Sequence, residues 1–184
     1  MTYKIGVFGS AIGSKKEVEE NAKLMGREIS NHGCILVSGG CKGLPYLASE
    51  AAFKNGGETL GYAPARSLDE QKGNNDPIDI FTKLVFIPKD IPFGDDILVR
   101  RKYRTVTSCA DCDAGIIIGG RMGTLNEFTN LFDMAKVIGV LQGSGGQTDL
   151  LPEIIRVANK DSGSIIISDK DPIQLVKRVV DQLK

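Results

Sequence analysis

The sequence predicts an α/β fold of the Rossmann type, with three layers in which helices cover both faces of a mostly parallel sheet. Short apolar runs alternate with longer amphipathic stretches along the chain, which is typical of repeated strand–helix–strand units. The runs are apolar throughout instead of alternating with polar residues, as expected for strands buried on both faces. Several runs end in glycine or serine next to a helical pattern. Because the chain has 184 residues, of which 41% are hydrophobic, we expect residues 1–184 to form a single domain.

The expected strands are apolar runs bounded by turn residues. They cover residues 3–8, 34–37, 58–62, 83–87, 114–118, 137–141 and 164–167. Helical patterns occupy residues 14–30, 44–54, 124–136, 151–159 and 172–183, and residues 94–109 contain a further, basic helix. Right-handed connections of this kind place successive strands parallel to one another.

The first helix has the clearest signals, and the segment 65–82 has the weakest. Ser14 followed by Glu17 is a capping box, and His32-Gly33 ends the helix. Apolar residues recur between these ends at helical spacing, at Val18, Ala22, Met25 and Ile29. Residues 65–82 are polar and rich in turn residues, so we expect a long surface loop there.

Three turns at the predicted carboxyl edge of the sheet are candidates for binding an anion. Glycine lets the backbone approach a ligand closely, and the free N–H groups at the start of a helix attract negative charge. Phosphate is therefore the expected ligand of these turns. The first turn lacks the G-x-G-x-x-G spacing and the chain has no Walker A sequence, which disfavours an ordinary NAD site or P-loop. The candidate binding residues are Gly9 and Ser10 in the first turn, Ser38, Gly39, Gly40 and Gly43 in the second, and Gly119, Gly120, Arg121, Gly123 and Thr124 in the third.

Charged residues beside the last turn could complete such a site. Arg101 and Arg104 are three residues apart and share a helix face, which is either solvated or available to phosphate. Glu127 follows Thr124 by about one helical turn. It is either the capping-box partner of Thr124 or a carboxylate that faces the cleft and meets a sugar or a water molecule.

Composition disfavours several classes of protein. Lys plus Arg and Asp plus Glu number 23 each, so the net charge is zero, which argues against a general nucleic-acid or membrane-surface binder. No window approaches the length of an apolar membrane span. The first residues run straight into a strand pattern without a signal peptide, so we expect a cytoplasmic protein.

The four cysteines are expected to be reduced. Cys109 and Cys112 have the C-x-x-C spacing of redox and metal sites, but packing as small apolar residues is the simpler interpretation. Cys34 and Cys41 do not complete a common zinc pattern. The single histidine, His32, disfavours Ser-His-Asp or Cys-His catalysis. We expect neither a metal nor a cofactor.

The glycine turns together with Arg104 and Gly123-Thr124-x-x-Glu127 resemble the LOG family. These lysine-decarboxylase-like proteins are grouped with molybdenum-cofactor carrier proteins, and the resemblance covers roughly residues 3–141. It implies cleavage of the N-glycosidic bond of a nucleoside 5′-monophosphate, with Arg104 and Glu127 in the active site. It also implies phosphate binding at Gly120, Gly123 and Thr124, and a dimer formed through helices near the site. Gly119 stands where the family usually has proline, and Arg121 stands where it has a second glycine.

Three hypotheses follow from these observations. The first is a phosphoribohydrolase, because a nearby carboxylate stabilises an oxocarbenium-like transition state while water attacks. The second is a non-catalytic protein that binds or carries a nucleotide or a phosphorylated, pterin-type cofactor, which Arg121 and the missing proline favour. The third is a thiol or metal protein built on Cys109 and Cys112.

Overall fold

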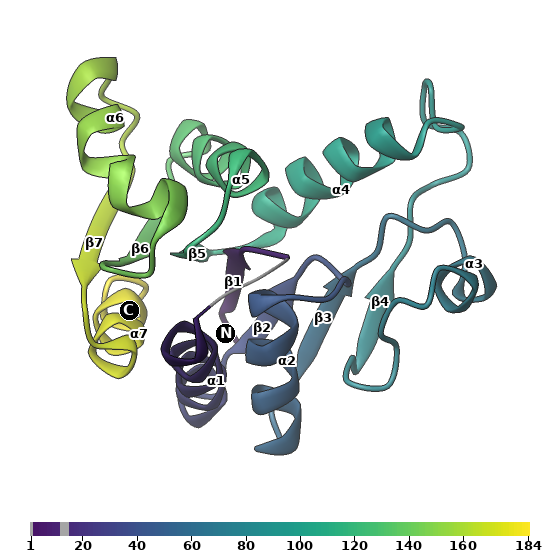
Figure 1. Ribbon diagram of the computed structural model, residues 1–184, viewed down its shortest axis with the longest axis horizontal. Coiled ribbons are helices and arrows are strands. Elements are labelled where there is room, and N and C mark those ends of the chain that lie inside the picture. Colours follow the sequence, from purple (N-terminus) through teal and green to yellow (C-terminus); the bar gives the residue numbers. More distant parts are fainter. Residues whose placement is uncertain (1, 12–14) are drawn as a thin grey trace.

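The computed structural model describes residues 2–11 and 15–184, and its strands form one parallel sheet (Figure 1). The sheet has seven strands in the order β4-β3-β2-β1-β5-β6-β7, and all the pairings between them are parallel. The strands are β1 (Lys4–Gly9), β2 (Ile35–Ser38), β3 (Thr59–Tyr62), β4 (Lys83–Val85), β5 (Ala114–Ile118), β6 (Val137–Leu141) and β7 (Ile165–Asp169). The predicted fold class is therefore confirmed.

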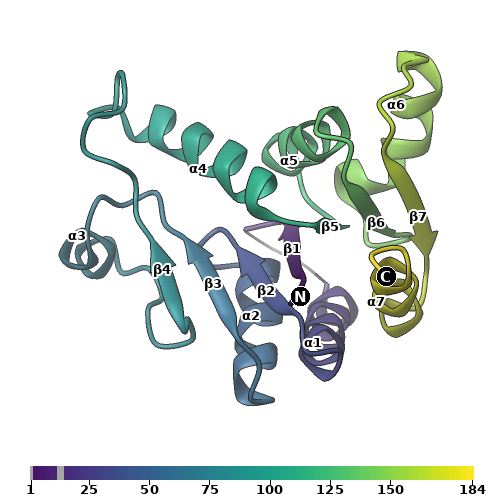
Figure 2. The ribbon, with the colours of Figure 1, turned by 180° about the vertical axis from the view of Figure 1, so that it is seen from behind.

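Helices cover both faces of the sheet, as the uniformly apolar strands predict. The helices are α1 (Lys16–Asn31), α2 (Leu44–Lys54), α3 (Leu68–Gly73), α4 (Ile97–Asp111), α5 (Met122–Asp133), α6 (Leu151–Ala158) and α7 (Pro172–Asp181), with a 3₁₀ turn η1 (Gly146–Leu150). Helices α1, α2 and α7 lie on one face, and α4, α5 and α6 lie on the other (Figures 1 and 2). Within β1, Ile5 and Val7 join the core under α1, whereas Phe8 joins the core under α5. None of the helices in the described ranges is long and apolar enough to cross a membrane.

The chain reverses its direction across the sheet beside β1. Strands β1 to β4 are added in one direction, and α4 then carries the chain back so that β5 pairs with the other side of β1. Gly9 at the end of β1 lies opposite Ile118 at the end of β5. Ligands of open α/β sheets bind in the crevice at such a switch point. The strand order therefore places the first and third glycine turns side by side.

The segment predicted as a loop over residues 65–82 contains a helix, α3, and this prediction was wrong in that part. The Ser67 hydroxyl accepts a hydrogen bond from the N–H of Glu70 at 3.2 Å, and the Glu70 carboxylate accepts one from the N–H of Arg66 at 2.7 Å. Arg100 on α4 pairs with Glu70 at 2.6 Å. A capping motif and a tertiary ion pair thus stabilise a helix too short and polar to show a helical hydrophobic pattern.

Two expected helix starts need comment. Helix α5 begins at Met122 instead of Thr124, because Arg121 occupies the extended N-cap position, and it ends before Ala135, which has a left-handed φ of 53°. Thr124 is therefore inside the first turn, and no side chain caps this helix. The expected capping box at Ser14 lies outside the described residues.

Candidate functional site

A two-lobed cleft opens at the carboxyl ends of β1 and β5. We call the two hollows the larger lobe, about 510 Å³, and the smaller lobe, about 220 Å³; Ser10 and Arg121 line both. The larger lobe is lined by Ser10, Lys15, Val18, Leu44, Gly119, Gly120, Arg121, Gly143, Ser144, Gly145 and Gly146. The smaller lobe is lined by Gly9, Ser10, Ala11, Arg104, Arg121, Gly123, Thr124 and Glu127. The cleft lies at the switch point of the sheet, where a ligand is expected.

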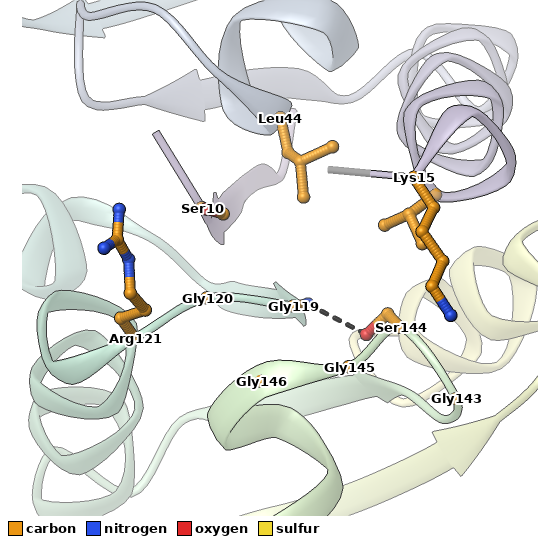
Figure 3. Close-up of a pocket in the computed structure, with 11 residues that line it drawn as sticks. Ser10, Lys15, Leu44, Gly119, Gly120, Arg121, Gly143, Ser144, Gly145 and Gly146 are labelled. Carbon is orange, nitrogen blue, oxygen red and sulfur yellow. Dashed lines mark hydrogen bonds between the residues drawn. The ribbon is translucent and has the colours of Figure 1, made fainter. Parts of the chain in front are cut away.

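The turn after β5 forms the wall between the larger lobe and α5 (Figure 3). Its residues Gly119 and Gly120 have φ angles of 56° and 100°, which favour glycine. A Cβ atom on Gly120 would lie 2.1 Å from Oγ1 of Thr124, so a side chain there would collide with the first turn of α5. This close approach holds the backbone of the turn against the helix start.

The loop after β6 completes the larger lobe and was not assigned to the site from sequence. The N–H of Gly119 donates to Ser144 Oγ at 2.8 Å, and the N–H of Gln147 donates to the Gly120 carbonyl at 3.0 Å. A Cβ on Gly146 would lie 2.1 Å from that carbonyl oxygen. The sequence shows that residues 142–147 are rich in glycine. It does not show that β6 pairs with β5, which is what brings this loop to the cleft.

The smaller lobe joins a helix start to an arginine and a glutamate. The first hydrogen bond of α5 runs from the N–H of Leu125 to the Arg121 carbonyl at 3.0 Å, so the earlier amides of Gly123 and Thr124 have no acceptor in the helix. Both residues line the smaller lobe, together with Arg104 and Glu127. Residues with free helix-start amides, an arginine and a glutamate therefore line one small space.

Arg104 is anchored by the second glycine turn. Its Nη1 donates to the Gly39 carbonyl at 2.8 Å, while its Nε is buried and has no hydrogen-bond partner in the described parts of the chain. A Cβ on Gly39 would lie 1.8 Å from that Nη1, so a larger residue would displace the guanidinium group from this position. The turn after β2 thus positions Arg104 at the edge of the smaller lobe.

Glu127 is a half-buried carboxylate, and its side chain receives no hydrogen bond from any described residue. Burial raises the pKa of Glu127 to about 7, although the positive charges of Arg104 and Lys102 act in the opposite direction. A carboxyl group with this pKa exchanges protons near neutral pH. Such a group in a cleft is typical of a general acid or base.

Several residues predicted for the site do not line either lobe. Ser38 is buried and accepts a hydrogen bond from Ser49 at 2.9 Å, and the Gly40 carbonyl accepts one from Gln71 at 2.7 Å. Gly43 packs against Ala11, where its Cβ would lie 2.4 Å from the Ala11 Cα. The turn after β2 therefore supports the cleft from behind, with Gly39 holding Arg104.

Arg101 also stands outside both lobes, exposed on α4. The remaining predicted residues do line the cleft: Gly9, Ser10, Arg104, Gly119, Gly120, Arg121, Gly123, Thr124 and Glu127.

The C-x-x-C pair lies in the core. Cys109 and Cys112 are 0% and 1% exposed, and both are free thiols. Burial raises the pKa of Cys109 to about 12 and also raises that of Cys112, so neither is a ready thiolate. Within residues 2–11 and 15–184, no group of three or more His, Cys, Asp or Glu side chains is placed to hold a metal ion.

Comparison with known proteins identifies relatives of this fold. The family model described as the SLOG cluster4 family matches residues 2–176. No curated protein matches the chain. Among solved structures, a structural-genomics target, TM1055, is 20% identical with a TM-score of 0.78, covering 98% of this chain and 99% of that one.

Two further solved structures are of proteins described by what they bind. The molybdenum cofactor binding protein of Rippkaea orientalis is 21% identical with a TM-score of 0.70, covering 98% of each chain. DNA processing protein A of Helicobacter pylori, titled for single-stranded DNA binding, is 18% identical with a TM-score of 0.71, covering 98% of this chain and 81% of that one. At these identities the likeness concerns the fold.

Proposed function

We propose a function from the premise that this chain belongs to the SLOG cluster4 family, which confirms the resemblance to LOG-type proteins drawn from its motifs. The cleft binds the 5′-phosphate of a nucleoside monophosphate and cleaves its N-glycosidic bond, releasing the free base and ribose 5-phosphate. The observation that carries this proposal is the Glu127 carboxylate, which has a pKa of about 7 and lies beside Arg104 and the open amides of α5.

The phosphate is assigned to the start of α5. Gly123 and Thr124, whose amides have no acceptor in the helix, line the smaller lobe, and the positive end of the helix dipole attracts an anion there. Arg121 at the N-cap position adds a cation that can donate two hydrogen bonds to phosphate oxygens. Gly120 supports this arrangement because its bare backbone allows Thr124 to pack closely.

The chemical step uses Glu127 and a water molecule. As the bond between C1′ and the base nitrogen breaks, C1′ develops positive charge, which the Glu127 carboxylate stabilises. Glu127 accepts a proton from the water whose oxygen bonds to C1′, and that proton passes to the departing base. Arg104 holds the carboxylate and substrate oxygens in place by its charge. The step requires neither a metal nor an organic cofactor.

Base release from the 5′-monophosphates of adenosine, guanosine, cytidine and uridine tests this function. We expect release from at least one of them, and a loss of about 100-fold or more in Glu127→Gln, the scale of general acid–base catalysis. Glu58→Gln removes an exposed glutamate far from the cleft and is the matched control, expected to retain activity. A folded protein that releases no base from any of the four would overturn the hydrolase.

A second candidate is a non-catalytic protein that binds a nucleotide or a molybdopterin-type cofactor. Arg121 favours it, because this side chain lines both lobes and occupies space where LOG enzymes have glycine. The molybdenum cofactor binding protein among the structural neighbours also supports it. Ligand-dependent stabilisation by nucleotides or pterin phosphates, without any product, would favour this candidate over the hydrolase.

The same proposal includes the ligand class, the oligomeric state and the cellular compartment of the protein. A small phosphorylated ligand suits the cleft and the zero net charge better than a strand of DNA. Two apolar side chains are exposed on the helices that supply Arg104 and Glu127: Leu98 at the start of α4 is 62% exposed, and Met122 at the start of α5 is 69% exposed. We assign this surface to a homodimer contact in the cytoplasm, and light scattering of the purified protein would measure the mass.

A further inference from the structure

The proposed function assigns no part of its substrate to the larger lobe. The groups it needs, Glu127, Arg104 and the amides of Gly123 and Thr124, all line the smaller lobe. The larger lobe has more than twice the volume, about 510 Å³ against 220 Å³. Arg121 and Ser10 line both lobes, so the two hollows lie next to each other.

The chemistry of the larger lobe suits a negatively charged group. Its charged lining side chains are Lys15 and Arg121, and no carboxylate side chain is among its described lining residues. Figure 3 shows these two cations on opposite sides of the hollow, with the Gly119–Gly120 turn between them. A group that enters past Arg121 therefore meets a second cation at the far side.

Two residues that line the same hollow have backbone amides available as hydrogen-bond donors. Gly145 and Gly146 line it with φ angles of 83° and 65°, and their N–H groups have no acceptor among the residues that the structure describes. The Ser144 hydroxyl is already used, because it donates to the Leu141 carbonyl at 2.6 Å and accepts from Gly119. Phosphate oxygens are suitable acceptors for such a set of amides and an ammonium group.

From these observations we infer that the larger lobe is a second phosphate subsite, so that the ligand is a nucleotide with a second phosphate joined to its 5′-phosphate. The first phosphate lies at the start of α5 and the second extends past Arg121 towards Lys15 and the loop after β6. The inference rests on the proposed assignment of the first phosphate to the smaller lobe. The ligand class is a nucleoside 5′-diphosphate or a derivative linked through that second phosphate.

Calorimetric titration with matched pairs of nucleotides tests the inference. The probes are the 5′-mono- and 5′-diphosphates of adenosine, guanosine, cytidine and uridine, and the quantity compared is the ratio of their affinities. We expect the diphosphate of the preferred nucleoside to bind about tenfold more tightly than its monophosphate. Lys15→Ala should bring that ratio close to one, because it removes the cation that only the second phosphate reaches.

Lys16→Ala is the matched control for charge, because Lys16 is exposed and does not line the cleft. It should leave the ratio unchanged. Equal binding of mono- and diphosphate by the unaltered protein, or a ratio that Lys15→Ala does not change, would overturn the second subsite while leaving the proposed function intact. If no monophosphate or diphosphate binds, the proposed nucleotide site itself fails.

Discussion

Replacing Glu127 by glutamine should stabilise the protein, and the gain should depend on pH. In the folded state burial raises the pKa of Glu127 from 4.5 to about 7. Between these two values the folded protein holds a proton that the unfolded chain has lost, so the free energy of unfolding falls as pH rises. Ionisation of Glu127 lowers the free energy of unfolding by its full amount above about pH 7, and it has no effect below pH 4.5.

The size of the effect follows from the shift in pKa. The difference between a pKa of 4.5 and one of about 7 corresponds to at most about 3 kcal/mol, which solvent at the partly exposed carboxylate reduces to roughly 1–3 kcal/mol. Glutamine keeps the shape of the side chain and removes the ionisation. The variant should therefore gain this amount of stability at pH 8 and gain little at pH 5.

Urea unfolding of the unaltered protein and of Glu127→Gln at pH 5 and pH 8 measures this difference in the free energy of unfolding directly. The exposed Glu58→Gln variant serves as control and should shift stability equally at both pH values. If Glu127→Gln changes the free energy of unfolding by the same amount at pH 5 and pH 8, the carboxylate is not destabilised by burial. The acid–base role assigned to it would then lose its basis.

Two further predictions concern the core and the turns. Gly120→Ala should destabilise the fold by about 1–3 kcal/mol, because the residue has a φ of 100° and its new methyl group would lie 2.1 Å from the Thr124 side chain. Gly123→Ala is its control: an added Cβ meets nothing within 4 Å in the first turn of α5, so urea unfolding should show unchanged or increased stability, and equal losses in both variants would contradict the packing argument. In a thiol titration, Cys109 and Cys112 should stay unreactive in the native protein and react after unfolding; fast labelling of either in the native state would be inconsistent with their burial.

The local sequence determined most of the strands and helices that form the three layers of this protein. Uniformly apolar runs such as 114–118 predict strands covered on both faces, and the structure has β5 there between two helical layers. Helical spacing of apolar residues likewise predicted α1, whose buried residues include Val18, Ala22, Met25 and Ile29. These features depend on the periodicity of the backbone, which a short window of sequence contains.

Which residues line the cleft depended on contacts between residues that are distant in sequence. The order of the strands placed the turns after β1 and β5 together and brought the loop after β6 beside them, whereas the turn after β2 became the support of Arg104. Helix α3 is held by Arg100, which lies 30 residues from Glu70 in the chain. The pKa of Glu127 arises from burial among neighbouring elements. Local sequence determines the conformation of each turn, but only long-range strand pairing and packing decide which turns meet and how far water is excluded between them.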